Sequence, residues 1–347
     1  MRYRKLRISL RTFLITTTIV GCGIGLLVRR YLTERAAEDK LVTNGLSVSF
    51  QPWGGNGEYW AYDQNHERQE ATKTFLGRMR WELLRHAKYV DGQRSAELQD
   101  SPSKISDESL VPLEKLRHVE LLYLGFQPIG DNGLTHLRKL RSLKHLNLCG
   151  TKITDDGLSK LTSLSNLEYL AMEFTNVSDA GLQFVGELRN LRDLGLMDTK
   201  VTGSGLKYFG TLSHLESLGL GGDPIRSDDL RNLTRLRNLE TLDLSETKID
   251  DEAAVYVSQL KSLKTLWLEN TKVGDKFIAG IASLRNLNDL NVSGTRISNA
   301  SEAVIKSFPR LEQFYCSDTA MDDDTQDRID AFTEANSDAE FDRVSNE

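Results

Sequence analysis

Apolar residues recur along most of this chain with a period of 24 residues. Windows that step by 24 from Leu143 in both directions align without any insertion or deletion. In every window the residues at offsets 0, 3, 5, 10, 18 and 21 from the start are apolar, if Cys316 is counted. A repeat this regular indicates a stack of similar structural units in place of one irregular core. The nine windows begin at Val119, Leu143, Leu167, Leu191, Leu215, Leu239, Leu263, Leu287 and Leu311.

The spacing within each window predicts one short strand and one short helix. Offsets 3 and 5 share one face at period two, which is typical of a strand, and offsets 15, 18 and 21 have helical spacing. Neither element can bury its apolar side alone, so neighbouring units must stack into one continuous core. A partial tenth unit precedes the nine, because residues 105–116 follow the same pattern.

The consensus of these windows, LxxLxLxxTxITDxGLxxLxxL, resembles the leucine-rich repeat. The resemblance implies an α/β fold, a right-handed solenoid with a parallel β-sheet on its concave face and short helices on its convex face. We assign residues 95–332 to this solenoid. Within the family, the units are similar to the cysteine-type repeats of ubiquitin-ligase adaptors and to the repeats of membrane-anchored bacterial proteins of planctomycete type.

Offset 8, which is usually Asn in this family, is Thr in seven of the nine windows. A buried hydroxyl can donate one hydrogen bond and accept others. We therefore predict that these threonines form a hydrogen-bond ladder between adjacent coils. They are Thr151, Thr175, Thr199, Thr247, Thr271, Thr295 and Thr319.

Offset 12 holds residue types that favour the N-cap of a helix, mostly aspartate. This position predicts a structural role at the start of each short helix, in preference to metal binding or acid–base chemistry. The residues of this column are Asp107, Asp131, Asp155, Asp179, Gly203, Ser227, Asp251, Asp275, Asn299 and Asp323.

The first thirty residues differ from the rest in charge and predict a membrane anchor. Residues 1–11 contain five Lys or Arg, and the uncharged segment 12–28 follows, closed by Arg29 and Arg30. This segment is near the short end of the length that spans a bilayer, and its basic flank places the N-terminus inside. We expect a single-pass signal anchor in the cytoplasmic membrane, with the repeat domain outside. Two alternatives stay open: a lipoprotein signal with Cys22 as the lipidated residue, and a cleaved secretory peptide.

The segments that flank the solenoid carry weaker signals. Residues 29–94 are interpreted as a juxtamembrane region and N-terminal cap, with a helix that leaves the membrane, a turn at Asn44 and Gly45, and then a short strand. A helix over residues 72–90 is expected to close the exposed end of the repeat core. Residues 333–347 contain few apolar residues and several acids, which predicts a disordered acidic tail.

The charge of residues 31–347 argues against nucleic-acid binding, and the lack of catalytic motifs argues against an enzyme. Residues 31–347 carry 37 Lys and Arg against 50 Asp and Glu, and a body this acidic is a poor partner for nucleic acid. The six histidines lack metal-ligand spacing, and the sequence has no GxSxG, HExxH or phosphate-binding loop. We therefore predict a protein without catalytic residues, metals or cofactors.

Offsets 1, 2, 4, 6 and 7 are expected on the concave face or its edge, because they flank or alternate with the buried strand positions. At offset 4, small residues occupy the middle of the array and aromatic residues occupy both ends, which predicts a hollow between aromatic walls. Exposed aromatic residues are typical of interfaces with proteins and peptides, and nearby acids favour a basic partner segment. The predicted partner-binding residues are Tyr123, Tyr169, Phe174, Asp243, Trp267, Glu269 and Tyr315.

Together these features predict a membrane-tethered, non-enzymatic leucine-rich repeat scaffold that mediates protein–protein interaction outside the cytoplasmic membrane. Its partners would be a protein or peptide and, through the N-terminal helix, the membrane itself. A ubiquitin-ligase-type substrate adaptor is one alternative, but a basic membrane segment stands where its recruitment module would lie. A structural cell-envelope protein is a second alternative, which a featureless concave face would favour.

Overall fold

The computed structural model describes residues 33, 36, 37, 39–41, 43, 44, 47–49, 89–91 and 105–344 of the chain. The predicted basic segment 1–11, the predicted membrane span 12–28 and most of the predicted cap region lie outside the described residues. Within the described ranges, no helix combines the length and the apolar character needed to cross a membrane.

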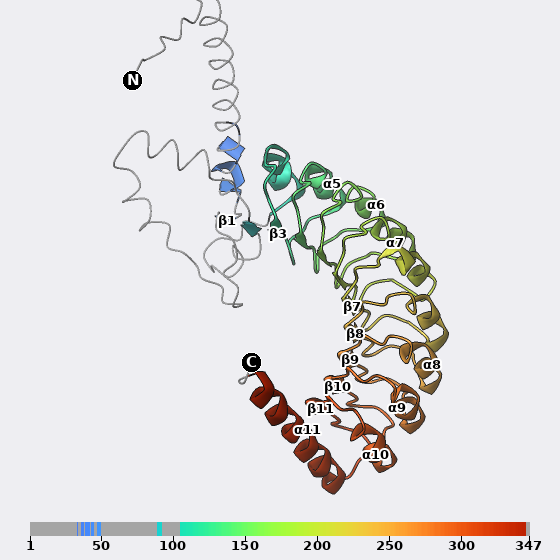
Figure 1. Cartoon of the computed structure of the whole chain (residues 1–347). Helices are drawn as coiled ribbons and strands as arrows, with labels where there is room; N and C mark the ends of the chain where they lie inside the picture. Colours follow the sequence, from blue (N-terminus) through green and yellow to red (C-terminus); the bar gives the residue numbers. More distant parts are fainter. Residues whose placement is uncertain are drawn as a thin grey trace, which may run out of the picture.

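One sheet follows the inner curve of the array (Figure 1). Each repeat contributes a three-residue strand that pairs in parallel with the strand 24 residues later, so that Leu146 lies beside Leu170. The repeat strands are β3 (Leu121–Tyr123), β4 (His145–Asn147), β5 (Tyr169–Ala171), β6 (Asp193–Gly195), β7 (Ser217–Gly219), β8 (Thr241–Asp243), β9 (Thr265–Trp267), β10 (Asp289–Asn291) and β11 (Gln313–Tyr315). At the N-terminal end, β2 (Tyr89–Asp91) pairs in parallel with β3 and antiparallel with β1 (Ser47–Ser49).

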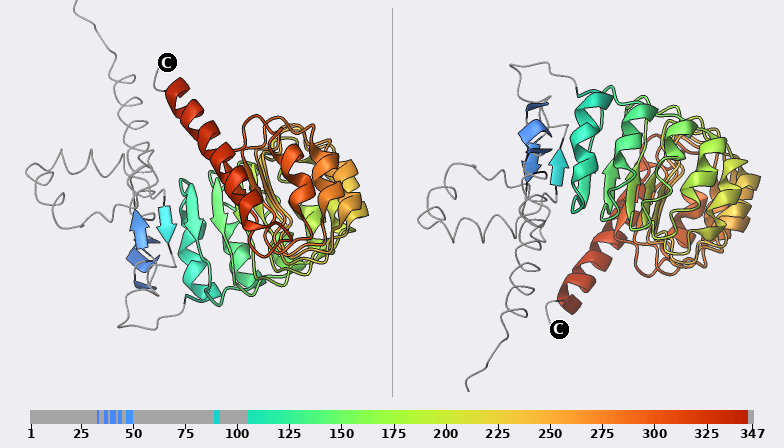
Figure 2. Two further views of the ribbon diagram at one scale, coloured as in Figure 1. Left: turned by 90° about the horizontal axis from the view of Figure 1, so that it is seen from below. Right: turned by 90° about the horizontal axis from the view of Figure 1, so that it is seen from above.

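Short helices cover the outer curve of the same arc, and views from above and below show the coils stacked in chain order (Figures 1 and 2). Many are 3₁₀ helices, labelled η, because only one or two turns separate the strand-to-helix loop from the next strand. The helices are η1 (Asp107–Lys115), α5 (Asp131–Leu134), η2 (Thr135–Leu137), α6 (Asp155–Leu158), α7 (Asp179–Val185), η3 (Gly205–Thr211), η4 (Ser227–Asn232), η5 (Asp251–Ala253), α8 (Ala254–Val257), α9 (Asp275–Ile281), η6 (Asn299–Ser301) and α10 (Glu302–Ile305). The prediction of a concave parallel sheet and convex short helices is confirmed.

The apolar columns of the sequence form one continuous core between the sheet and the helices. In the second window Leu143, Leu146 and Leu148 are fully buried, and the same positions are buried in the windows that follow. Each buried leucine contributes about 1.5–3 kcal/mol relative to an exposed one. Phe209 and Phe277 fill the same core from the helix side.

A turn with left-handed backbone follows every repeat strand, at offset 7. Its amide donates to the carbonyl of the residue at offset 6 in the next coil, as in the 2.7 Å bond from Phe126 N to Cys149 O. Positive φ orients this amide toward the neighbouring coil, although it is unfavourable for residues other than glycine. The residues with positive φ are Phe126, Gly150, Phe174, Asp198, Gly222, Glu246, Asn270, Gly294 and Asp318.

The predicted threonine ladder between coils is wrong. Thr151 Oγ1 donates to Leu148 O of its own coil at 2.6 Å, and Thr175 bonds Met172 O in the same way at 2.7 Å. The short side chain reaches the carbonyl three residues earlier, so it closes the turn of its own coil. Thr199 differs because its hydroxyl and amide both contact the carboxylate of Asp223 in the next coil.

The prediction that offset 12 caps its own helix is also wrong. Asp155 is the first residue of α6, and its carboxylate accepts bonds from Ser178 N at 2.7 Å and Ser178 Oγ at 2.6 Å. Asp131 bonds Thr154 in the same manner. Because the side chain reaches the neighbouring coil, the column joins successive coils, except at Gly203, which has no side chain.

Asparagine at offset 23 supplies a second link between coils. Asn166 Nδ2 donates to Arg141 O at 2.8 Å, and Asn190 Nδ2 donates to Ser165 O at 2.7 Å. These bonds fix the loops that lead from each helix into the next strand. A ladder of hydrogen bonds between coils is therefore formed by these asparagine side chains, and the threonines do not form it.

The C-terminal end of the array is closed by helix α11 (Asp323–Val344), which corrects the tail predicted as disordered over residues 333–347 as far as Val344, where the described residues end. Ile329 and Thr333 are buried against the last coil, and Asn336 Nδ2 donates to Leu311 O at 2.8 Å. The segment contains no glycine or proline, so the helix continues from this docked part to Val344. The sequence prediction failed because it counted apolar residues and omitted these polar contacts.

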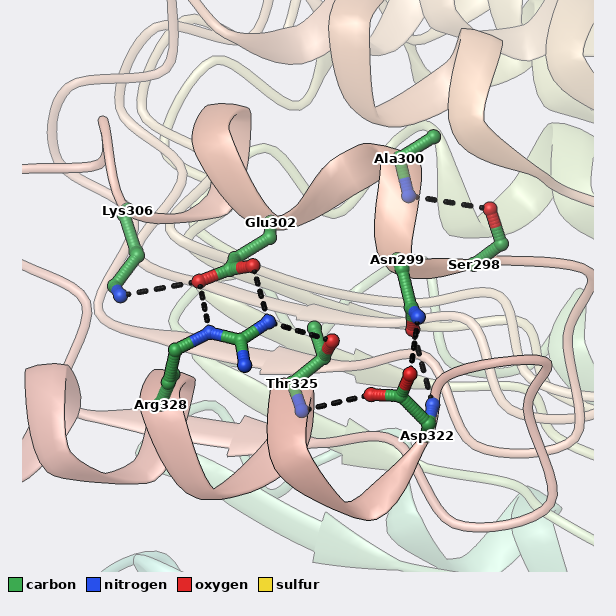
Figure 3. Close-up of polar contacts among 8 residues, drawn as sticks. All are labelled: Ser298, Asn299, Ala300, Glu302, Lys306, Asp322, Thr325 and Arg328. Atoms are coloured by element: carbon green, nitrogen blue, oxygen red, sulfur yellow. Dashed lines mark hydrogen bonds and ion pairs between the residues drawn. The ribbon is translucent and has the colours of Figure 1, made fainter.

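Polar contacts fix the start of α11 on the preceding coil (Figure 3). Asp322 accepts a bond from Thr325 N at 2.9 Å and therefore caps the helix. Asn299 and Asp322 exchange two bonds, one through Asn299 Nδ2 at 2.6 Å and one from Asp322 N at 3.0 Å. Arg328 contacts Glu302 of α10.

At the other end, Asn44 lies in a turn, and β1 follows it, as predicted. Ala37 and Leu41, on helical positions before that turn, are buried as part of the repeat core. Asn44 Nδ2 donates to Ser109 O at 3.3 Å. The helix predicted over residues 72–90 is wrong at its end, because Tyr89 and Val90 belong to strand β2, and its other residues lie outside the described residues.

Candidate functional site

The concave face is formed by offsets 2 and 4, which alternate with the buried strand leucine, and by offsets 6 and 7 just after the strand. Across the nine windows these columns contain eight acids and no Lys or Arg. Residues 105–344 contain 27 Lys and Arg in total, so the absence of cations from this face reflects segregation of charge. The eight acids are Glu173, Asp193, Asp198, Asp243, Glu246, Glu269, Asp289 and Asp318.

Glu173 is the centre of a polar cluster in the N-terminal half of this face. Cys149 Sγ donates to Glu173 Oε2 at 2.5 Å. Burial and the bond to Glu173 raise the pKa of the Cys149 thiol to about 12. The thiol is therefore protonated at neutral pH and is not an activated nucleophile.

Two further groups in this cluster have raised pKa values. Burial, followed by the charge of Glu173, raises the pKa of Asp193 to about 6. Burial and Glu173 also raise the pKa of Tyr169, whose ring stacks on His145 with centroids 5.7 Å apart. A cation that docked here would stabilise the ionised form of Asp193 and lower its pKa.

The hollow predicted from the small residues of offset 4 is partly filled by side chains of the preceding coils. The carboxylate of Glu173 lies over Gly195, where a Cβ atom would overlap it. Met197 lies over the next glycines, with its Cγ 3.4 Å from a Cβ placed at Gly219 and its Cε 3.2 Å from one at Gly221. The carboxylate of Glu173 and the thioether of Met197 therefore cover the glycines in the middle of the face, and both side chains stay half-exposed.

The predicted binding residues fall into two groups on this face. Tyr123 ends β3, Tyr169 begins β5, and Phe174 occupies the left-handed turn after β5 with 56% of its surface exposed. At the other end, Trp267 is 39% exposed at the end of β9 and Tyr315 is 48% exposed at the end of β11. Their role in binding stays a prediction.

The two predicted acids of the C-terminal group differ in exposure. Asp243 is only 5% exposed, and its Oδ1 accepts a bond from Ser245 N at 2.9 Å, so it supports its own turn. Glu269 remains exposed and accepts a long bond from Asn291 Nδ2 at 3.5 Å. Glu269 is thus the better placed of the two to meet a partner.

Sequence reasoning missed Asp289, which begins β10 beside Trp267. Burial raises the pKa of Asp289, and the neighbouring Trp267 side chain opposes this effect. Its buried Oδ1 has no hydrogen-bond partner among the described residues. The alternation of the strand, which places offset 2 on the same face as offset 4, was the signal that could have identified both Asp289 and Asp193.

No group of three His, Cys, Asp or Glu side chains in the described part of the chain is arranged to hold a metal ion. The face instead offers single acids, aromatic rings and hydroxyl groups in parallel columns. Such columns can contact an extended chain or a folded surface at many points.

The repeated strand and short helix, the buried leucine columns and the concave parallel sheet define a leucine-rich repeat solenoid. A family model described as "Leucine Rich repeat" matches residues 139–161 and 235–258, and the chain is a leucine-rich repeat protein. No curated protein matches it. The resemblance to membrane-anchored proteins of planctomycete type remains a prediction.

Two solved structures illustrate the likeness of fold. An internalin (inlF) from Listeria monocytogenes is 22% identical over 61% of this chain and 72% of that chain, with a TM-score of 0.43. An internalin C2 from the same organism is 22% identical over 61% of this chain and 84% of that chain, with a TM-score of 0.47.

Proposed function

We propose that this protein is a non-enzymatic scaffold whose concave face binds a protein partner through a basic segment. The observation that carries the proposal is the charge of that face, which has eight acids and no Lys or Arg. Opposite charge across an interface increases the rate of association and selects the partner. The proposal includes a location outside the cytoplasmic membrane, with residues 12–28 as the tether.

Exposed aromatic residues at both ends of the face provide anchors for such a partner. Trp267 and Tyr315 are two coils apart, and Tyr169 and Phe174 lie toward the other end. Large aromatic side chains carry much of the binding energy in protein interfaces. Acids between the two groups would contact Lys or Arg side chains of the segment that joins the anchored residues.

The test measures binding of a synthetic peptide with alternating arginine and valine to the purified full chain by fluorescence anisotropy. A peptide in which glutamate replaces arginine is the control ligand. Binding of the basic peptide should weaken about tenfold or more when Trp267→Ala and Tyr169→Ala are combined. Added salt should weaken it further, because the charges at this face are partly exposed.

The matched control removes two exposed apolar side chains from the helix side of the solenoid, Val111→Ala with Val255→Ala. This variant should bind the basic peptide as the unmodified chain does. Loss of binding in this variant, or unchanged binding in the concave variant with an unchanged circular dichroism spectrum, would contradict the proposed face.

A further inference from the structure

The lateral edge of the solenoid where each helix leads into the next strand is strongly basic. This helix-to-strand edge consists of offsets 19–23, from residues 114–118 in the first coil to residues 306–310 in the last. It contains twelve Lys and Arg and two acids, Glu114 and Glu187. The edge therefore has the opposite charge to the concave face that it borders.

The outermost position of this edge is offset 22, which is basic in most coils. All of its cations are exposed. Lys261 donates to Ser283 Oγ at 2.8 Å and Arg285 donates to Ser307 O at 3.0 Å. The other four side chains make no hydrogen bond or ion pair with any described residue. The cations of this column are Arg117, Arg141, Arg189, Arg237, Lys261 and Arg285.

The backbone beneath these cations is rigid. The carbonyl of Arg141 accepts from Asn166 Nδ2 at 2.8 Å, and the carbonyl of Arg237 accepts from Ser262 Oγ at 2.7 Å. Because each coil is tied to the next in this way, the column follows the spacing of the strands, about 4.8 Å per coil. The backbone positions of these cations therefore form one row along the edge, and their side chains are exposed to solvent.

Helix dipoles do not explain this row. Cations are favoured within the last turn of a helix, but α7 ends at Val185 and Arg189 lies four residues later. The η2 helix ends at Leu137, and Arg141 also lies four residues beyond it. Helices this short have small dipoles, and the effect decays within one turn, so interaction with a helix end does not account for the cations of offset 22.

Three of the five acids at offset 1, next to the edge, pair with a cation of the same column, whereas Glu168 and Glu312 form no ion pair with a described residue. At offset 1, Lys144 pairs with Glu120 at 3.5 Å and Lys264 pairs with Glu240 at 2.6 Å. The acids of offset 7 lie nine residues beyond offset 22 along the chain, after the strand and its left-handed turn.

We propose that the helix-to-strand edge docks on the surface of an anionic lipid bilayer. A bilayer presents phosphate groups at every point along the row, and basic residues near such a surface are attracted to it. The edge has no exposed aromatic side chain, which argues against stacking on single-stranded nucleic acid and against an anchored protein interface. A row of cations without apolar anchors fits lipid headgroups best.

If this edge lies on the membrane, the concave face is perpendicular to the bilayer and opens parallel to the membrane surface. A partner attached to the same membrane could then reach Trp267 and Glu173 without crossing the solenoid. The inference concerns a different surface from the proposed partner site and stands without it. A tether at residues 12–28 would raise the local concentration of lipid at the edge, but the charge of the edge is what selects the orientation.

The test places the full chain in vesicles of phosphatidylcholine, with or without phosphatidylglycerol. A dye is attached through an encoded unnatural residue at position 165, in the offset 22 column, or at position 176, in the offset 9 column on the opposite edge. A quencher on the lipid headgroups reports which edge is close to the bilayer. Quenching at position 165 should exceed quenching at position 176 several-fold when phosphatidylglycerol is present, and high salt should abolish the difference.

Two triple variants that each remove three positive charges distinguish the effect of the edge from the effect of the net charge of the protein. The first is Arg141→Ser, Arg189→Ser and Arg237→Ser, which the column accommodates because Ser165 and Ser213 already occupy it. The second is Lys200→Asn, Lys248→Asn and Lys272→Asn at offset 9, where Asn176 is native. The first variant should lose at least half of the quenching difference, and the second should retain it.

Three results would overturn the proposal. Equal effects of the two variants would mean that only net charge matters. The same quenching difference in pure phosphatidylcholine would mean that the tether alone sets the orientation. The third result combines two observations. Quenching at position 165 would not change with phosphatidylglycerol, and it would fall when a single-stranded oligonucleotide is added. Together they would assign the edge to a polynucleotide.

Discussion

Arg328 of α11 donates from Nε and from Nη2 to the two carboxylate oxygens of Glu302 in the preceding coil, both at 2.8 Å. Lys306 adds a third contact to the same carboxylate at 3.2 Å. The bonds to Arg328 are the main cause that lowers the pKa of Glu302 to about 2. This paired fork holds a largely polar helix against the end of the leucine core (Figure 3).

Replacing Arg328 with Ala should loosen α11 while leaving the repeats intact. The fork and the bond from Arg328 Nη2 to Thr325 Oγ1 would both be lost. Amides of α11 should then exchange hydrogen faster in mass spectrometry, with little change between residues 143 and 290. Glu334→Gln, on an exposed position of the same helix, should not change the exchange. An equal increase in hydrogen exchange in all coils after Arg328→Ala would contradict this prediction, because it would show that α11 stabilises every coil equally.

The fork also predicts a response to acid. Because the pKa of Glu302 is lowered from 4.5 to about 2 in the folded state, its contribution is present above about pH 4.5 and is lost as the pH falls toward 2. Protection of the α11 amides, taken relative to their intrinsic exchange rate at each pH, should fall over this interval before the repeats unfold. An α11 whose protection persists unchanged to pH 2 would contradict the role of the pair.

The link between Asp155 and Ser178 should stabilise the contact of two coils. Asp155→Ala leaves the Ser178 amide without its partner, and we expect a loss of about 1–3 kcal/mol in the free energy of unfolding. A double-mutant cycle with Ser178→Ala, measured by urea unfolding of the full chain, should show positive coupling. Additive effects of the two substitutions would mean that the carboxylate acts on its own helix after all.

A core substitution provides the larger effect against which such links are compared. Leu196 is fully buried behind β6, and Leu196→Ala should cost about 2–5 kcal/mol through lost burial and an internal cavity. Urea unfolding would give this value, with partial unfolding of the array allowed for in the fit. A cost below that of Asp155→Ala would show that the core can repack around the missing side chain.

Asp223 should make stability depend on pH near neutrality. It replaces threonine at offset 8, is fully buried, and burial raises its pKa from 3.8 to about 7 despite bonds from Thr199. The folded chain binds this proton more tightly than the unfolded chain does, so stability is fully present below about pH 4 and falls as the pH rises to about 7. At about 1.4 kcal/mol per pKa unit, the loss is at most about 4 kcal/mol.

The matched variant for this prediction is Asp223→Asn. An amide cannot ionise, and its oxygen can still accept from Thr199 N, as the carboxylate does at 3.0 Å. The variant should show a flatter stability profile between about pH 4 and 7 and should be more stable than the unmodified chain at pH 8. Identical profiles for the two proteins would place the titrating group elsewhere, with Asp193 as the next candidate.

The sequence predicted the architecture because the apolar columns depend only on local spacing. Leu146 and Leu170 are 24 residues apart in the chain, and a stack of equal coils must place them side by side. The partners of polar side chains were harder to predict. Asp155 has the local spacing of a helix cap, yet its partner lies 23 residues later, so its orientation depends on the assembled stack.

The sequence likewise predicted the exposed strand residues of the candidate site and did not predict the contacts between side chains. Trp267 and Tyr315 followed from strand alternation and are exposed as expected. The position of Glu173 over Gly195 did not follow, because it requires knowing that one side chain leans across the coil boundary. Asp243 is buried in its own turn, which composition alone does not reveal.

The constant period has a consequence for how such a chain can change its length. The repeated links between coils, such as the one between offsets 12 and 11 and the one from Asn at offset 23, join the same two positions in successive units, so a unit of 24 residues is a natural segment for duplication or loss. If residues 167–190 were excised, Asp155 would meet Thr202, whose amide and hydroxyl now bond Asp179 as Ser178 bonds Asp155. The span of the concave surface can therefore grow or shrink by one coil wherever the new junction brings such matching residues together, as it does here.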